Sequence, residues 1–337
     1  MDTRFTPRRT LVGAAIGLLP VLASAGYQAY ATRRDERRYP PRGVLVDVDK
    51  GRRLHVHRVG HAHEGPTVLL EGGMSCPHDV WGWVQTAVSR FAPTISYDRA
   101  GIGYRDPGPL PRTAERITED LVRALDAIGD KGPYVLVGHS FGGLLVRHFA
   151  ERYPNRVAGV VLIDAAHPEE LERSPRQRMG LPMMLAQMRA AVRGSTFGVL
   201  RYSQTYVGNG VKSLPEESRE WARARMMTTK TWRGAYAEML GWLEHVNDET
   251  RDTRLPAGVP LAVVTAERSQ NSDPAHGEFQ VELAGLSSNS VHRVIPAAEH
   301  LGLVMREDFA CHVTRAIEDV VAAARSGRPL TEGVHHE

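Results

Sequence analysis

The sequence predicts an α/β fold in which a mostly parallel sheet carries helices on both faces and a helical cap is inserted. Over residues 43–166 and 255–337, short apolar runs of strand length alternate with segments of helical periodicity. Parallel strands need a crossover connection, so this alternation builds a parallel sheet covered on both sides. Between these two parts, residues 167–254 hold several helical patterns and no strand-like run.

The chain is long enough for one large domain with a substantial core. It has 337 residues, of which 42% are hydrophobic and 24% charged, as is ordinary for a globular protein. Residues 1–42 carry eight Arg and three acidic side chains, a net charge of +5, so the total of +3 leaves −2 for residues 43–337. The body therefore has no basic excess, and no nucleic-acid partner is expected.

An apolar segment near the N-terminus predicts contact with a membrane. Residues 10–31 contain no charged side chain, and Arg8-Arg9 precede them. An uncharged, mostly apolar run of about 20 residues can span a bilayer as a helix. We therefore expect a single N-terminal anchor at the cell membrane. Residues 32–42, which are charged and contain prolines, predict a linker between this segment and the folded part.

The alternative for the same segment is an export leader. Arg8-Arg9-Thr10 resembles the start of a twin-arginine signal. Residues 23–25 and 29–31 each offer an A-x-A cleavage site. Because arginines stand on both sides of the apolar run, the positive-inside rule leaves its orientation open.

The folded part begins with a predicted β-hairpin, because residues 43–60 contain two alternating runs around Asp49-Lys50-Gly51. His55 and His57 alternate with apolar residues on the second run, which predicts that they face solvent rather than bind a metal. Cys76 and Cys311 form no disulfide framework and no zinc-binding spacing. We expect no metal and no organic cofactor.

The alternation that follows can be assigned element by element. Further strands are expected at 67–71, 93–98, 134–137, 157–164, 259–265 and 291–295, and helices at 79–91, 113–129, 141–153, 276–285 and 307–324. Thr113 is a suitable N-cap, and Gly129 and Pro154 mark helix ends.

The inserted segment 167–254 predicts a helical cap rich in flexible side chains. It contains seven of the ten methionines of the chain. Thioethers adapt to varied apolar shapes, so these residues predict either a pocket for a hydrophobic group or the packing of the cap itself. The residues concerned are Met179, Met183, Met184, Met188, Met226, Met227 and Met239, with Trp221, Trp232 and Trp242.

One short stretch carries the chemistry. Gly138-His139-Ser140-Phe141-Gly142 joins a predicted strand directly to a predicted helix and fits the pattern G-x-S-x-G. In that context the pattern is typical of a nucleophile elbow, where a strained turn lifts a serine hydroxyl out of the backbone. The start of the helix beneath Ser140 favours negative charge that develops above it.

With these residues, the chain resembles the α/β-hydrolase fold family over about residues 43–325. Further marks are Glu71-Gly72-Gly73-Met74, Asp98-Arg99-Ala100-Gly101-Ile102-Gly103 and Glu299-His300, each placed after a predicted strand. The set is similar to esterases, lipases and related capped hydrolases. The resemblance implies an eight-stranded, mostly parallel sheet with the site at the carboxyl ends of the strands.

The resemblance also implies a catalytic order of serine, acid and histidine along the chain. His300 follows the last strand and precedes the last helix, where the family places its base. The common position for the acid falls near Ser269, which is not acidic, so Asp164 at the end of the sixth strand is preferred, followed by Glu267 and Asp273. A carboxylate that ends an apolar strand needs a partner, and a histidine N–H provides one.

Two backbone N–H groups are expected to bind the oxyanion of the tetrahedral intermediate. In the resemblance, one belongs to Phe141 and the other to Met74. The family's usual histidine before the donor loop is Gly72 here, which leaves Gly73 as an alternative donor. Cys76 is expected to be a bystander rather than a nucleophile.

The expected function is that of a serine hydrolase that cleaves carboxylic esters of a small hydrophobic acyl group through an acyl-enzyme. The same three side chains also serve acyl transfer, perhydrolysis or the cleavage of carbon–carbon bonds. A non-catalytic binding protein on this scaffold is the alternative from another class. Physiological substrate and oligomeric state are not encoded in any of these patterns.

Overall fold

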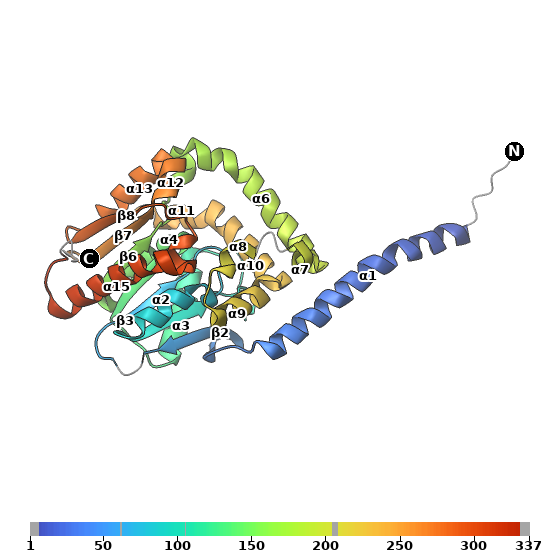
Figure 1. Ribbon diagram of the computed structural model, residues 1–337, viewed down its shortest axis with the longest axis horizontal. Coiled ribbons are helices and arrows are strands. Elements are labelled where there is room, and N and C mark those ends of the chain that lie inside the picture. Colours follow the sequence, from blue (N-terminus) through green and yellow to red (C-terminus); the bar gives the residue numbers. More distant parts are fainter. Residues whose placement is uncertain (1–6, 61–62, 105, 204–207, 331–337) are drawn as a thin grey trace.

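The computed structural model describes residues 7–60, 63–104, 106–203 and 208–330, with their side chains except those of residues 7–19 and 208–209. At its centre lies an eight-stranded sheet in the order β1-β2-β4-β3-β5-β6-β7-β8 (Figure 1). The strands are β1 (Val44–Asp49), β2 (Arg52–Val59), β3 (Thr67–Glu71), β4 (Thr94–Asp98), β5 (Tyr134–His139), β6 (Val157–Ile163), β7 (Leu261–Ala266) and β8 (Ser290–Ile295). The predicted fold class is confirmed.

The pairing of the strands places the loops that follow the parallel strands at one edge of the sheet. β1 pairs with β2, and β2 with β4, in antiparallel fashion, so the expected hairpin forms. All later neighbours in the sheet pair in parallel. The carboxyl ends of β3, β5, β6, β7 and β8 therefore share one edge, where open α/β sheets bind ligands.

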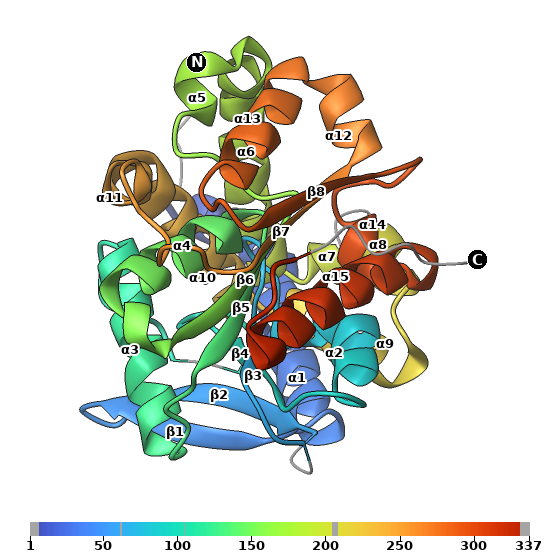
Figure 2. The same cartoon turned by 90° about the vertical axis from the view of Figure 1, so that its left-hand side faces the viewer.

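Helices cover the two faces of the sheet (Figure 2). On one face pack α2 (Gly82–Val88) and α15 (Glu307–Ser326), and on the other α3 (Ala114–Ala127), α4 (Phe141–Arg152) and α13 (Pro274–Ala284). Strand residues alternate between the faces, so Val135 and Val137 join the first apolar core and Leu136 joins the second. Short helical turns complete the layers: η1 (His78–Trp81), η2 (Pro154–Arg156), α12 (Glu267–Ser272) and α14 (Gly302–Met305).

The segment between β6 and β7 contains helices and no strand among its described residues. Its elements are α5 (Glu170–Arg173), α6 (Pro175–Thr196), α7 (Val199–Ser203), α8 (Gly208–Lys212), α9 (Glu216–Met226), α10 (Thr229–Gly241), η3 (Trp242–Val246) and α11 (Asn247–Thr250). Met239 and Trp242 of this cap pack against Phe141 and Leu144 of α4. The cap therefore rests directly on the helix that follows Ser140.

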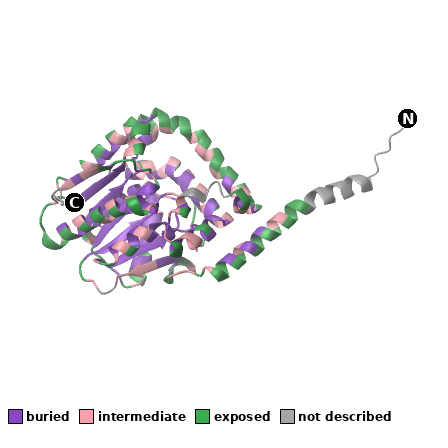
Figure 3. Ribbon diagram, viewed as in Figure 1, coloured by how far each residue is buried: buried purple, intermediate pink, exposed green. Residues whose placement is uncertain are grey.

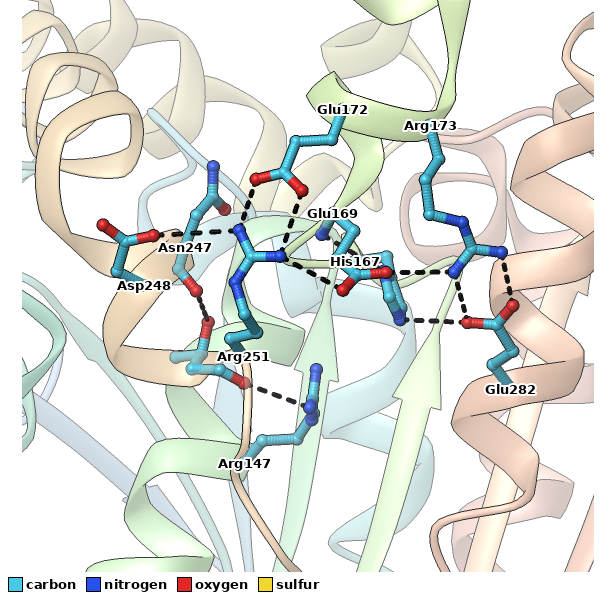
Figure 4. A network of polar contacts seen from close by, with 10 residues as sticks. Arg147, His167, Glu169, Glu172, Arg173, Asn247, Asp248, Arg251 and Glu282 are labelled. Carbon is cyan, nitrogen blue, oxygen red and sulfur yellow. Dashed lines mark hydrogen bonds and ion pairs between the residues drawn. The ribbon is translucent and has the colours of Figure 1, made fainter.

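A polar network holds the base of the cap (Figure 4). Arg251, just after α11, pairs with Glu172 and with Glu169, the latter at 3.1 Å. Arg173 of α5 pairs with Glu169 at 3.1 Å and with Glu282 of α13 at 2.5 Å. Single exposed pairs contribute little, but the network connects the first and last parts of the cap to a helix of the core.

The N-terminal helix α1 (Pro7–Arg38) continues through most of the expected linker and contacts the cap (Figure 1). Gln28 Nε2 donates to the Met227 carbonyl at 2.8 Å, and Asp35 pairs with Arg201 at 2.5 Å. These partners bury one side of the helix, whereas its other sides stay exposed (Figure 3). Residues 32–38 are therefore helix rather than extended linker.

Within the described residues, the structure contains no helix that is long and apolar enough to cross a membrane. The side chains of residues 10–19, which form the first part of the expected anchor, lie outside the described set.

The predicted solvent exposure of His55 is wrong. Its side chain is fully buried, and His57 on the same strand face is only partly exposed. The rings of His78 in η1 and of Tyr104 lie 4.4 and 5.3 Å from the His55 ring and cover this face of β2. An alternating strand predicts solvent on its polar side only when no later segment folds over it.

Candidate active site

Ser140 occupies a strained turn between β5 and α4. Its backbone has φ 54° and ψ −124°, a region that residues with a side chain rarely adopt. This is the strand-turn-helix setting that the G-x-S-x-G pattern requires. Phe141 is the first residue of α4, so its N–H has no acceptor within the helix.

Gly138 and Gly142 permit this turn because any side chain there would meet backbone. A Cβ atom on Gly138 would lie 2.7 Å from the carbonyl oxygen of Gly142. A Cβ atom on Gly142 would lie 2.4 Å from the carbonyl oxygen of Glu71. Both contacts are shorter than real Cβ atoms tolerate, so the turn and the loop after β3 fit together only with glycine at both positions.

Asp164 and His300 meet at the carboxyl edge of the sheet. His300 Nδ1 donates to Asp164 Oδ2 at 2.7 Å, which leaves Nε2 of the ring available. The Asp164 carboxylate also accepts the backbone N–H of Ala266 at 2.9 Å and the hydroxyl of Ser269 at 2.6 Å. The carboxylate is thus held rigidly while its histidine partner stays partly exposed.

A second histidine, His276 of α13, shares the same carboxylate. Its Nε2 donates to Asp164 Oδ1 at 2.9 Å, and the side chain is almost fully buried. No sequence pattern predicts a site role for this residue. The available signal was Pro274, which fixes the start of α13 and places position 276 in its first turn, close to the strand ends.

The two histidines set the charge of Asp164. Burial alone would raise the pKa of this carboxyl, but the hydrogen bonds from His276 and His300 outweigh burial and hold the pKa far below its usual range. For His276, burial alone would lower the pKa, but the hydrogen bond to Asp164 outweighs burial. The pKa of His276 is therefore raised above its usual value. Asp164 is therefore a carboxylate at all ordinary pH values.

These side chains line one cavity of about 380 Å³ beneath the cap. Ser140, Asp164, His276 and His300 are among its polar lining residues. Of the cap side chains selected from the sequence, Met184, Met188, Met239 and Trp242 form part of its wall, together with Met74. In contrast, Met179 and Met183 are exposed, and Met226 and Met227 are buried in the core.

The loop after β3 lies against the serine. A Cβ atom on Gly73 would be 3.3 Å from Ser140 Cβ, so the backbone of this loop passes very close to Ser140. Met74 and Phe141, the expected oxyanion donors, both line the cavity. Arg99 fixes the backbone of this loop, because its guanidinium donates to the carbonyls of Gly72 at 2.7 Å and Gly73 at 2.8 Å.

The alternative acids have other partners. Glu267 accepts the backbone N–H of Ala297 at 2.8 Å, in the loop that leads to His300. Asp273 lines the cavity, but its carboxylate accepts the hydroxyl of Ser174 at 2.7 Å. Of the three candidate acids, Asp164 is the one whose carboxylate is hydrogen-bonded to His300.

Two further groups near the site are unreactive in this setting. Burial raises the pKa of the Cys76 thiol to about 11, so the thiolate is scarce at neutral pH. Burial, assisted by the nearby His300, lowers the pKa of His139 to about 3. Neutral His139 donates from Nε2 to the carbonyl of His300 at 3.1 Å and so supports the loop that carries His300.

Comparison with known proteins places the chain in a family. Residues 66–304 match the family described as alpha/beta hydrolase fold. The chain belongs to this family. The chain spans about half the length of two curated relatives that it matches, 48% and 52% of each.

Individual relatives and solved structures agree with this assignment. Lipase LipV of Mycobacterium tuberculosis is 38% identical over 114 residues, which are 34% of this chain and 42% of that protein. An esterase from Thermogutta terrifontis superposes with a TM-score of 0.59 at 22% identity, covering 83% of this chain and 98% of the other. A putative lipase from Acinetobacter baumannii gives 0.63 at 17% identity, covering 89% and 97%. At these identities the structures show a shared fold.

Proposed function

We propose that this hydrolase-family protein is a serine hydrolase that cleaves carboxylic esters through an acyl-enzyme. Membership of the alpha/beta hydrolase fold family and its esterase and lipase relatives support hydrolase activity. The observation that carries the finer proposal is the His300–Asp164 hydrogen bond of 2.7 Å in the cavity that Ser140 also lines. A serine hydroxyl becomes a nucleophile only when a neighbouring base accepts its proton.

In the proposed reaction, Ser140 Oγ attacks the ester carbonyl while His300 Nε2 accepts the hydroxyl proton. The carbonyl oxygen becomes an oxyanion, which the N–H groups of Phe141 and Met74 stabilise. His300 then protonates the leaving alkoxide, and an acyl group remains on Ser140. Water, deprotonated by His300, releases the carboxylic acid and restores the serine. Asp164 holds the ring in the required tautomer and stabilises its charged form.

The cavity wall supports a hydrophobic acyl group of modest size. Met184, Met188 and Met239 offer flexible thioethers, and Trp242 offers a broad apolar surface. A cavity of about 380 Å³ lies near the lower end of the range for small-molecule sites. We expect short to medium acyl chains to be preferred over long ones.

Two measurements test the proposal. A fluorophosphonate probe should label the full chain at Ser140, and the Ser140→Ala variant should stay unlabelled. A panel of p-nitrophenyl esters of graded chain length should show turnover that Ser140→Ala removes. Well-folded protein that gives neither an adduct on Ser140 nor turnover of any ester would contradict a serine hydrolase and favour a binding protein on this scaffold.

We also propose that the N-terminal segment associates with the cell membrane or is translocated across it. The uncharged run of residues 10–31, with Arg8-Arg9 before it and arginines after it, supports this placement. Fractionation of cells and sequencing of the mature N-terminus distinguish the cases. Protein in the membrane fraction with its original N-terminus indicates an anchor, and released protein that begins near residue 26 or 32 indicates a cleaved leader.

A further inference from the structure

A second cluster of polar side chains lies apart from the proposed catalytic residues. His55 of β2, His78 of η1 and Asp98 of β4 each offer one ligand atom, and these atoms lie within 4.8 Å of one another. All three side chains are buried, with exposures of 0%, 3% and 0%. We propose that this cluster is a binding site for a divalent metal ion of the zinc class.

The first argument is the position of protons on the two rings. His55 Nε2 contacts the carbonyl oxygen of Arg42, which only accepts, so this nitrogen carries a proton. His78 Nε2 faces Asp79 Oδ1 at 3.5 Å, which is also an acceptor. In the neutral form of His55, the proton is therefore on Nε2 and Nδ1 presents a lone pair, whereas Nδ1 of His78 donates a hydrogen bond to Asp98 Oδ1.

Both Nδ1 atoms face the same carboxylate. His55 Nδ1 is 3.2 Å from Asp98 Oδ2, and His78 Nδ1 is 3.2 Å from Asp98 Oδ1. Among the residues that the structure describes, His55 Nδ1 has no hydrogen-bond partner, so its contact with the carboxylate is close without being a well-formed hydrogen bond. The lone pair of His55 Nδ1 and the Asp98 carboxylate repel each other unless a cation lies between them, and a metal ion there would also replace the proton on His78 Nδ1.

The second argument is the balance of buried charge. Asp98 and Asp79 supply two carboxylates, and within the described part of the chain their ion pairs involve only His55 and His78. Asp79 Oδ2 has no hydrogen-bond partner among the described residues, although the side chain is buried. The guanidinium groups of Arg42 and Arg225 stack on Trp221 and Tyr104. One divalent cation balances the charge of the two carboxylates.

The donors match zinc in kind and in spacing. Two imidazole nitrogens and a carboxylate oxygen are a common zinc set, with room for water as a fourth ligand. Zinc bonds of about 2.0–2.1 Å place tetrahedral ligands ~3.4 Å apart, close to the two separations of 3.2 Å. The Arg42 carbonyl and the Asp79 carboxylate sit behind the rings, as the outer partners of metal-binding histidines do.

The surroundings fix the carboxylate and provide a route to it. The Asp98 carboxylate also accepts the backbone N–H groups of His78 at 2.8 Å and Tyr104 at 3.3 Å. His78 and Asp79 line a separate cavity of about 370 Å³, through which an ion and its water can reach the cluster. The metal would tie β2, η1 and β4 together, and Asp98 directly precedes Arg99, which holds the loop at Ser140.

The test uses the full chain without an affinity tag and with His335→Ala and His336→Ala, so that the tail contributes no ligands. Zinc binding is measured at pH 7.5 by competition with a chromophoric chelator, after metal has been removed and after dialysis. Cobalt is then substituted to report coordination by its visible absorption. The expected results are one zinc ion per chain and a tetrahedral cobalt spectrum.

Matched variants locate the ion. His55→Gln, His78→Gln and Asp98→Asn should each weaken zinc at least about 100-fold. His292→Gln on β8, a histidine bonded to Thr265, should bind zinc as the parent does. Zinc should also raise the thermal midpoint of the parent and not that of Asp98→Asn. Because the zinc measurement on the parent needs none of the buried substitutions, a variant that fails to fold does not remove the test.

Three results would overturn the proposal. The first is a parent chain that binds no zinc at stoichiometric concentrations. The second is nitrogen NMR that shows His55 and His78 as imidazolium rings in the presence of zinc. The third is zinc binding that Asp164→Asn abolishes and His78→Gln leaves intact, which would place the ion at the catalytic cavity instead.

Discussion

Arg99 and Glu238 form a doubly hydrogen-bonded ion pair that is buried between the sheet and the cap. Arg99 Nε and Nη2 donate to the two carboxylate oxygens of Glu238 at 2.7 and 2.9 Å. The same guanidinium bonds Glu71 at 2.6 Å and two carbonyls of the loop beside Ser140. Burial alone would lower the pKa of Arg99, but Glu238 and Glu71 raise it well above its usual value. One side chain therefore joins the cap to the proposed oxyanion loop.

Replacing Arg99 by Met should strongly destabilise the protein and slow ester turnover. The substitution leaves Glu71 and Glu238 buried without their cation, and such a loss costs about 3–5 kcal/mol of unfolding free energy. Urea denaturation measures this change. Arg123→Ala, which breaks an exposed pair with Glu119, is the matched control and should cost less than about 1 kcal/mol. An Arg99→Met protein as stable as the control variant would show that the buried pair has no such role.

The three candidate acids give a direct comparison by conservative substitution. Asp164→Asn keeps the shape of the side chain but no longer favours the charged histidine, so kcat should fall about 10³–10⁴-fold. Glu267→Gln and Asp273→Asn should change kcat by less than about 10-fold, because their carboxylates bond other groups. Steady-state kinetics on the preferred p-nitrophenyl ester measures all three. If Asp273→Asn lost more activity than Asp164→Asn, the acid would be assigned wrongly.

The order of strands and helices in the core could be predicted from the sequence because each is set by local pattern. Strand β5 is buried along its whole length, and its uninterrupted apolar run predicts a strand that is buried on both faces. The helices α3 and α15 have clear amphipathic periods and were expected within a few residues of their bounds. The short turns α12 and α14 were not expected, since six and four residues carry too little periodicity to be distinguished from loop.

The contacts that are remote in sequence could not be predicted in the same way. His276 contacts Asp164 across 112 positions of the chain, and β3, η1 and α2 lie between His55 and Asp98 in the sequence. In the sequence, nothing distinguishes either histidine from an ordinary polar residue. Its carboxylate partner comes close only when the chain folds. The docking of α1 on the cap is of the same kind, because Asp35 and Arg201 lie far apart in the chain.

Substituting Gly73 by Ala should reduce turnover more than it reduces stability. The new methyl group would stand 3.1 Å from His139 Nδ1 and 3.3 Å from Ser140 Cβ, so the loop must shift by a few tenths of an ångström. A displaced oxyanion donor costs about 10–100-fold in kcat. Gly180→Ala in α6, where a Cβ atom meets nothing within 4 Å, is the control and should keep full activity. Equal kcat values for the two variants would show that the position of the Gly73 loop does not affect the reaction.

Glu170 gives the protein a pH dependence that runs opposite to that of its surface acids. The side chain lines the cavity that contains Ser140, and burial raises its pKa to about 7. A carboxyl whose pKa is raised in the folded state contributes stability that is complete below the unfolded pKa of about 4.5 and is lost as the pH rises through 7. The loss is on the order of 3 kcal/mol between pH 4.5 and pH 8, since each pKa unit corresponds to ~1.4 kcal/mol.

The Glu170→Gln variant isolates this effect, because glutamine resembles the protonated carboxyl and does not titrate. Urea denaturation of both proteins should give similar unfolding free energies near pH 5 and a more stable variant at pH 8. Glu282→Gln provides a control of opposite sign: Arg173 lowers the pKa of Glu282, so its contribution is present at pH 8 and is lost as the pH falls. Glu282→Gln should therefore be the less stable protein at pH 8. A difference between wild type and Glu170→Gln that stays constant from pH 5 to pH 8 would show that Glu170 does not titrate in this range.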